Sequence, residues 1–154
     1  MKHSLKDILS TKKKQLDDQE PKWREKKQEW VHDVGQLYDD IEAWLTDLIK
    51  DGYISVSRDQ ATLSEEWLGV YKIEKLKIIF FNNQEVTLTP KGLHVIGAEG
   101  RIDMTIGSRV IMIVRVGDDL GWTFAEREGR GKPKRWEFNE NTFKELLAEY
   151  AEEF

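Results

Sequence analysis

Five basic residues gather in the stretch 127–136, the most distinctive local feature of the sequence. The stretch also contains two glycines and a proline and ends in Trp136, a composition typical of a mobile loop between strands. Cationic side chains on such a loop can neutralise phosphates while an indole stacks on a base. This pattern gives a nucleic-acid hypothesis, in which the binding residues are Arg127, Arg130, Lys132, Lys134 and Arg135.

The surroundings of this basic stretch argue for a plainer interpretation. Glu126, Glu128 and Glu137 lie within or beside it, and the chain carries a net charge of −5, whereas many nucleic-acid-binding domains are basic overall. Trp136 alternates with Phe138, which predicts that the indole faces the core. An exposed hairpin loop is therefore the favoured interpretation, and binding of nucleic acid or of an acidic partner is the alternative.

Asp103 and Glu126 are the carboxylate pair from which a catalytic metal site can be built. Both fall on predicted strands, and they would meet if those strands were neighbours, with Arg101 beside them on the open face of a sheet. Two converging carboxylates can hold a magnesium ion for hydrolysis. A cross-strand ion pair explains the same residues, so metal-dependent hydrolysis is a third hypothesis.

Motifs for the common catalytic chemistries are missing from the sequence. It has no GxxxxGK[ST] or GxGxxG phosphate loop and no HExxH or GxSxG signature. It has no cysteine, which excludes disulfides, thiolate metal ligands and cysteine nucleophiles. The three histidines are scattered, and His94 is predicted to be a packed strand residue rather than a base. These absences favour a protein that is not an enzyme and that uses no cofactor and no metal ion.

Two helices are predicted in the first third of the chain. Ser4 is a good helix cap, and the apolar spacing after it predicts a short helix over residues 4–17. The polar run 17–20 breaks this pattern, and Pro21 suits the first turn of a second helix over residues 21–50. Its apolar stripe is wider than a coiled-coil seam, which favours packing on the chain's own sheet over pairing with a second copy. The stripe consists of Trp23, Lys27, Trp30, Val34, Leu37, Ile41, Trp44 and Leu48, widened on one side by Val31, Tyr38 and Leu45.

After Gly52 the apolar period changes from that of a helix to that of a strand. Turn signals such as Gly107-Ser108 separate the apolar runs, so consecutive strands are expected to form antiparallel hairpins. The alternation in residues 101–106 indicates that one face of the sheet is buried and the other exposed. The segment 62–67 fits either a strand or a helical turn. The predicted strands are residues 53–58, 68–73, 75–81, 84–89, 93–97, 101–106, 109–116, 122–126 and 135–138.

A last helix is predicted over residues 142–153, where Thr142 and Glu145 have the spacing of a capping box. Its outer face is acidic, whereas residues 1–27 hold nine basic and five acidic side chains, a local charge of +4. These oppositely charged ends can meet within one chain or between two chains. The predicted fold is one α+β domain, with a basic helical arm at 1–20, a long amphipathic helix at 21–51 covering a mostly antiparallel meandering sheet at 53–138, and the C-terminal helix.

Composition sets the expectations for location and function. The apolar stretches fall far short of the roughly 20 residues that span a bilayer, and the amino end lacks a signal-peptide core. A soluble, cytoplasmic protein is therefore expected. The leading functional hypothesis is a non-enzymatic protein-binding or regulatory module, with a protein partner or self-association as a homodimer. Trp67 has no clear place on a buried face and is the predicted partner-contact residue.

Overall fold

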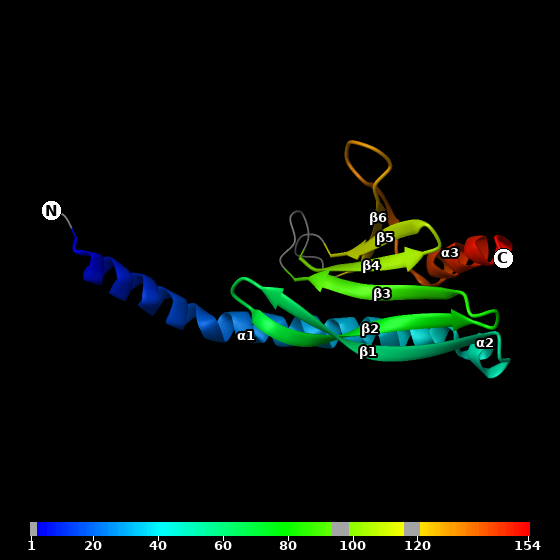
Figure 1. The fold of residues 1–154 in the computed structure, drawn as a ribbon, viewed down its shortest axis with the longest axis horizontal. Helices are drawn as coiled ribbons and strands as arrows, with labels where there is room; N and C mark the ends of the chain where they lie inside the picture. Colours follow the sequence, from blue (N-terminus) through cyan, green and yellow to red (C-terminus); the bar gives the residue numbers. More distant parts are fainter. Residues whose placement is uncertain (1–2, 94–98, 116–120) are drawn as a thin grey trace.

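Seven antiparallel strands form one open sheet, and α1 lies across one of its faces (Figure 1). The computed structural model describes residues 3–93, 99–115 and 121–154. The strands lie side by side in chain order, as expected for a meander of hairpins. The predicted α+β fold in a single compact domain is thereby confirmed. The elements are α1 (Leu5–Trp44), α2 (Thr46–Lys50), β1 (Ile54–Glu65), β2 (Gly69–Phe80), β3 (Glu85–Gly92), β4 (Arg101–Ile106), β5 (Arg109–Val114), β6 (Thr123–Glu126), β7 (Lys134–Glu137) and α3 (Glu140–Glu152).

α1 is a single helix of 40 residues, where two helices were predicted. Ser4 caps it as expected, since its Oγ accepts a hydrogen bond from the amide of Asp7 at 3.2 Å. The predicted break was wrong, because the helix continues through Pro21, which removes the hydrogen bond to the carbonyl four residues earlier and crowds that carbonyl with its ring. The described residues before Trp23 are exposed, so water can bind that carbonyl. Residues 5–22 therefore continue the helix as an arm that projects beyond the sheet (Figure 1).

The rest of α1 covers the sheet with the apolar stripe that was predicted to be buried. Trp30, Val34, Leu37, Tyr38 and Ile41 have at most 2% of their surface exposed. They pack against apolar residues of the strands in one continuous core. The helix does not run to residue 50 as predicted, since it ends at Trp44 and the short α2 follows. The prediction of a helix-covered sheet is confirmed, with this change at the end of the helix.

β1 and β2 form a hairpin of two twelve-residue strands, longer than the sequence pattern predicted. The buried alternation changes face near Arg58 in β1 and near Glu74 in β2. A twisting strand can change the face that it buries while it keeps its backbone hydrogen bonds. The predicted interruption of the second strand at residue 74 was therefore wrong. The segment 62–67 is strand as far as Glu65.

Arg58 fixes this hairpin to α1 at the point where the alternation changes. Its guanidinium donates to two carboxylates of α1, Asp39 at 2.6 Å and Glu42 at 2.9 Å. It also donates to Glu74 of the neighbouring strand at 3.2 Å. One arginine thus joins the helix and both strands through charge-assisted hydrogen bonds.

α3 begins earlier than predicted and uses a different cap. The Asn139 side chain accepts a hydrogen bond from the Thr142 amide at 2.9 Å, and the Thr142 hydroxyl accepts one from the Asn139 amide at 3.0 Å. The predicted box of Thr142 with Glu145 was wrong, because asparagine caps a helix at least as well as threonine and lies one turn earlier. The predicted strand 93–97, which includes His94, lies outside the described residues except for Leu93.

Candidate functional site

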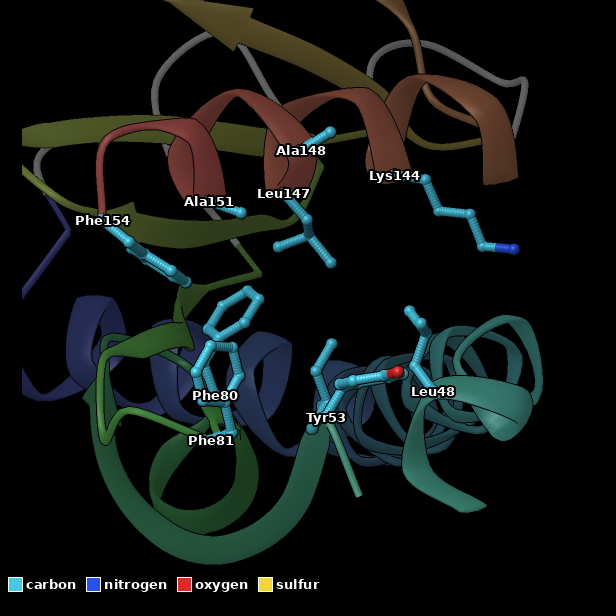
Figure 2. A pocket seen from close by; sticks show the side chains of 10 residues that line it. Leu48, Tyr53, Phe80, Phe81, Lys144, Leu147, Ala148, Ala151 and Phe154 are labelled. Carbon is cyan, nitrogen blue, oxygen red and sulfur yellow. The ribbon is translucent and has the colours of Figure 1, made fainter. Parts of the chain in front are cut away.

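A groove separates α3 from the opposite edge of the molecule (Figure 2). That edge consists of α2, the start of β1 and the end of β2. The volume of the groove is about 500 Å³. Its lining is almost wholly apolar, and it is named here the C-terminal groove. The lining residues are Leu48, Tyr53, Ile54, Phe80, Phe81, Lys144, Leu147, Ala148, Ala151 and Phe154.

α3 forms one wall of the C-terminal groove because both ends of the helix are fixed by aromatic contacts. Near its start, the ring of Phe143 lies 5.9 Å from the ring of Trp44 at the end of α1. Near its end, the Tyr150 ring lies 5.9 Å from Phe80, and the Tyr150 hydroxyl donates to Gln84 at 2.9 Å. The helix is therefore held over the sheet while its middle turns border an open groove.

Three aromatic side chains of the C-terminal groove are exposed, which is unusual for rings so close to a core. The exposed fractions are 70% for Phe81, 55% for Tyr53 and 46% for Phe154. The Phe154 ring stands edge-on to Phe80 at 5.1 Å and to Phe81 at 6.5 Å. An aromatic patch of this kind suits the binding of apolar side chains.

The lining of the C-terminal groove offers little for catalysis. Its ionisable groups are the side chains of Tyr53 and Lys144. The Lys144 ammonium donates to Glu140 at 2.6 Å, one turn earlier on α3. Because this ammonium is engaged with Glu140, the lining presents a mainly apolar surface with few ionisable side chains.

The outer surface of α3 beside the C-terminal groove is acidic. Residues 140–154 carry five glutamates and one lysine, a charge of −4. Glu145 and Glu152 are the i−3 and i+4 neighbours of Ala148, so they flank this groove residue on the same side of the helix. Both are exposed. The groove therefore combines an apolar floor with an acidic margin.

A pair of strand residues lies next to this acidic margin. Arg109 donates to Glu126 at 2.7 and 3.0 Å and to Glu149 of α3 at 3.4 Å. Hydrogen bonds from Arg109 lower the pKa of Glu126 below its ordinary value, and the same bonds raise the pKa of Arg109. Glu126 is therefore an ionised partner of Arg109.

The strand register separates the two carboxylates of the metal-site hypothesis. Asp103 of β4 pairs with Met112 of β5, and Met112 pairs with Ala125 of β6. Ala125 thus shares the face of Asp103, and Glu126, one residue on, points to the opposite face. Each carboxylate has its own arginine, since Asp103 accepts hydrogen bonds from Arg101 at 2.7 and 3.1 Å. The convergence that this hypothesis required is not found.

Residues 127–133 of the basic stretch form the connection between β6 and β7, which projects from the sheet (Figure 1), and residues 134–136 are the first three residues of β7. The five side chains predicted to bind nucleic acid are all exposed: Arg127, Arg130, Lys132, Lys134 and Arg135. The Trp136 ring stacks on the Phe124 ring at 5.1 Å and is half-buried, as its alternation with Phe138 predicted. The basic stretch therefore presents its charged side chains to solvent, while the indole of Trp136 in β7 packs against the core.

Trp67 lies in the turn between β1 and β2 with a φ of +74° and is 56% exposed. Its ring stacks on Trp23 of α1 at 6.3 Å. The turn thus contacts α1 where the arm begins. Exposure at this position agrees with the sequence-based expectation, and a role in partner contact stays a prediction.

Sequence reasoning missed the C-terminal groove. Phe81 and Phe154 were assigned only to the apolar patterns of a strand and a helix. One signal was present: Phe80 and Phe81 are adjacent aromatic residues at the end of a predicted strand, where strand alternation places only one of the two on the buried face. The groove itself depends on where α3 packs, which no local pattern specifies.

The fold and these surfaces define an α+β protein with an open antiparallel sheet, a projecting helical arm and an apolar C-terminal groove. No protein-family model, curated protein or solved structure shows a significant match to the chain. In the part of the chain that the structure describes, no three histidine, aspartate or glutamate side chains form a group that could hold a metal ion. Across the same residues, no helix has both the length and the apolar character needed to cross a membrane.

Proposed function

We propose that this protein is a non-enzymatic protein-binding module whose C-terminal groove receives an amphipathic helical segment with a basic polar face. The observation that supports this function most is the exposed aromatic lining of the groove at Tyr53, Phe81 and Phe154. Apolar surface of this kind beside charged residues is typical of protein-interaction sites.

The size of the groove fits such a ligand. Its volume of about 500 Å³ falls within the range typical of ligand-binding pockets. Burial of one leucine or phenylalanine side chain contributes roughly 1.5–3 kcal/mol. Two or three such anchors on one helix face would supply roughly 3–9 kcal/mol before the entropic costs of association.

The acidic margin supports the choice of a basic partner. Glu145 and Glu152 are exposed on either side of Ala148, and lysine side chains of a docked helix would meet them at the groove edge. Such rim charges mainly increase the association rate and the selectivity, and their effect weakens with added salt.

Substitution of Ala148 by arginine is expected to weaken the binding of a synthetic leucine–lysine amphipathic peptide by about tenfold or more. The long cationic side chain would occupy the groove mouth and repel the peptide. Ala148 is exposed on a helix, where arginine is also a good helix former, so the fold should persist. Isothermal titration calorimetry measures the affinity.

Val70→Arg is the matched control for this experiment. Val70 is 70% exposed and lies at the opposite end of β2 from Phe80, about 33 Å away along the strand. The control adds the same charge, and the affinity for the peptide should stay within about twofold of the unsubstituted value. Equal binding by both variants, or no binding by the unsubstituted protein, would contradict the proposed function.

Nucleic-acid binding by the 127–136 loop stays a second hypothesis, favoured by the five exposed cations and weakened by the packed Trp136. It predicts that joint replacement of Arg130, Lys132, Lys134 and Arg135 by alanine lowers the affinity for single-stranded DNA or RNA and flattens its dependence on salt. A gel-shift titration at several salt concentrations measures both effects. Unchanged binding by this variant would exclude the loop as a nucleic-acid site.

A further inference from the structure

The arm ends in a segment with the chemistry that the C-terminal groove is proposed to receive. Leu5, Ile8 and Leu9 have i, i+3, i+4 spacing, so they lie on one face of the helix. They are 70%, 46% and 57% exposed. Residues 1–14 carry five lysines and one aspartate, a charge of +4. The tip of the arm is therefore a basic amphipathic helix with an uncovered apolar face.

The amino-terminal and carboxy-terminal segments of the chain carry opposite charges. The segment 140–154, which forms one wall of the groove, has a charge of −4 against +4 for residues 1–14. Lys6, Lys12 and Lys13 are exposed on the arm, and Glu145 and Glu152 are exposed beside the groove. A docked arm would place ammonium groups near these carboxylates while its leucines enter the apolar floor.

The arm cannot reach the groove of its own chain. α3 packs beside the end of α1 through the contact between Phe143 and Trp44. Leu5 is 39 residues before Trp44 in the same helix, which places it about 58 Å away along the axis. Figure 1 shows the start of α1 and α3 at opposite ends of the molecule. An arm that occupies the groove must therefore come from another chain.

We infer that the C-terminal groove receives the arm of a second copy of this chain, so that copies associate head to tail with Leu5, Ile8 and Leu9 as the anchors. This inference rests on the proposed function of the groove. The arm and the groove are different surfaces of one chain, so their pairing gives a reciprocal two-fold dimer, a larger closed ring or an open filament. An arm–arm pair is the less favourable arrangement, because Lys12 interrupts the apolar stripe between Leu9 and Leu16.

The test uses two variants of the full chain that each destroy one of the two surfaces. Leu5→Glu with Leu9→Glu alters the arm and leaves the groove intact, whereas Ala148→Arg alters the groove and leaves the arm intact. All three positions are exposed, so neither variant removes core packing. Sedimentation velocity over a wide concentration range measures the mass of each protein and of their equimolar mixture.

Head-to-tail association predicts a mass for the unsubstituted protein that rises above the 18.1 kDa of one chain as the concentration increases. Each variant alone should stay at the mass of one chain. Their mixture should form a complex of twice that mass, about 36 kDa, because the intact arm of one variant fits the intact groove of the other. Val70→Arg should associate like the unsubstituted protein.

Two outcomes would overturn the inference. If Ala148→Arg still associates while the arm variant does not, the arm binds another arm or another surface, and the groove is not its site. If the unsubstituted protein has the mass of one chain at every concentration, no self-association exists. The leucine–lysine peptide titration then decides separately whether the groove binds basic helices at all, so failure of this inference is distinguishable from failure of the proposed function.

Discussion

Replacement of Trp30 by alanine is expected to lower the free energy of unfolding by about 3–5 kcal/mol, the range for truncation of a buried aromatic side chain. Trp30 has no exposed surface. Its Nε1 donates to the Tyr71 hydroxyl at 3.1 Å, and its ring lies 6.2 Å from the ring of Trp122. The truncation leaves a cavity where α1, the β1–β2 hairpin and the start of β6 meet. Typical domains are stable by about 5–15 kcal/mol, so this loss is a large share.

Two further variants separate the contributions of Trp30. Trp30→Phe keeps most of the packing but loses the N–H donor, which should cost about 1 kcal/mol for the hydrogen bond plus a smaller packing loss. Trp67→Ala removes the same kind of ring from a site that is 56% exposed and should cost less than Trp30→Ala. Urea unfolding followed by circular dichroism measures all three variants. Equal losses for Trp30→Ala and Trp67→Ala would contradict the packing of α1 on the sheet.

Tyr71 connects Trp30 of α1 to the β1–β2 hairpin through a chain of hydrogen bonds. Its hydroxyl accepts from Trp30 and donates to Glu65, and the Glu65 carboxylate also accepts from the Leu93 amide at 2.9 Å. Burial and the nearby Glu65 raise the pKa of Tyr71 above its ordinary value. The phenol therefore stays protonated and can serve as both acceptor and donor, which explains why a carboxylate lies so close to the core.

The buried charge of Arg115 has a structural explanation in the same region. Its side chain is only 6% exposed, and it donates to Asp33 of α1 at 2.7 Å. The guanidinium also lies 5.4 Å from the Trp30 ring and 4.9 Å from the Trp122 ring. An ion pair and two cation–π contacts offset the cost of removing this charge from water. Arg115, which directly follows β5, thus connects that strand to α1, and its guanidinium is buried rather than exposed to solvent.

The parts of the fold that could be predicted from the sequence are those in which the spacing of apolar residues shows which side chains are buried. The helical stripe from Trp30 to Ile41 is buried as predicted. In residues 101–106 the apolar positions Ile102, Met104 and Ile106 are also buried as predicted, but Asp103, predicted on the exposed face, is buried as well, where Arg101 pairs with it. The continuity of α1 through Pro21 was not predictable from pattern, because it depends on the solvent exposure of the arm. The cap at Asn139 was missed because several nearby residues can cap a helix.

The candidate site was less predictable than the fold, because it arises between elements that are distant in the chain. The C-terminal groove joins Phe81 to Phe154, and nothing in either local pattern indicates that they meet. The opposite faces of Asp103 and Glu126 follow from the pairing register across β5, which strand prediction alone did not establish. The opposite charges of the two chain ends were visible in the sequence. Only the structure shows that the arm and α3 lie too far apart to meet within one chain, so that a contact between them needs two chains.

Replacement of Gly100 by alanine is expected to lower the free energy of unfolding by on the order of 3 kcal/mol. Gly100 has a φ of +126°, a conformation that residues with a side chain rarely adopt. A Cβ there would lie 2.7 Å from Cζ3 of Trp30 and 3.3 Å from Nε of Arg115. Both neighbours are buried, and the carbonyl of Gly100 accepts from the Arg115 amide at 3.1 Å. Neither ring nor backbone can move away without loss of other contacts, so Gly100→Ala combines backbone strain with a steric collision.

Gly131→Ala separates these two causes, because Gly131 has a similar φ of +140° but no atom within 4 Å of the added Cβ. This control should cost about 1 kcal/mol or less, since the exposed loop around it can relax. A double-mutant cycle adds a second test: when Trp30→Ala removes the colliding ring, Gly100→Ala should lose its collision cost and retain only the backbone cost. Urea unfolding of the four proteins measures this coupling. Additive losses would show that Gly100 does not contact Trp30, and the packing between α1 and the strand that begins at Arg101 would then need another explanation.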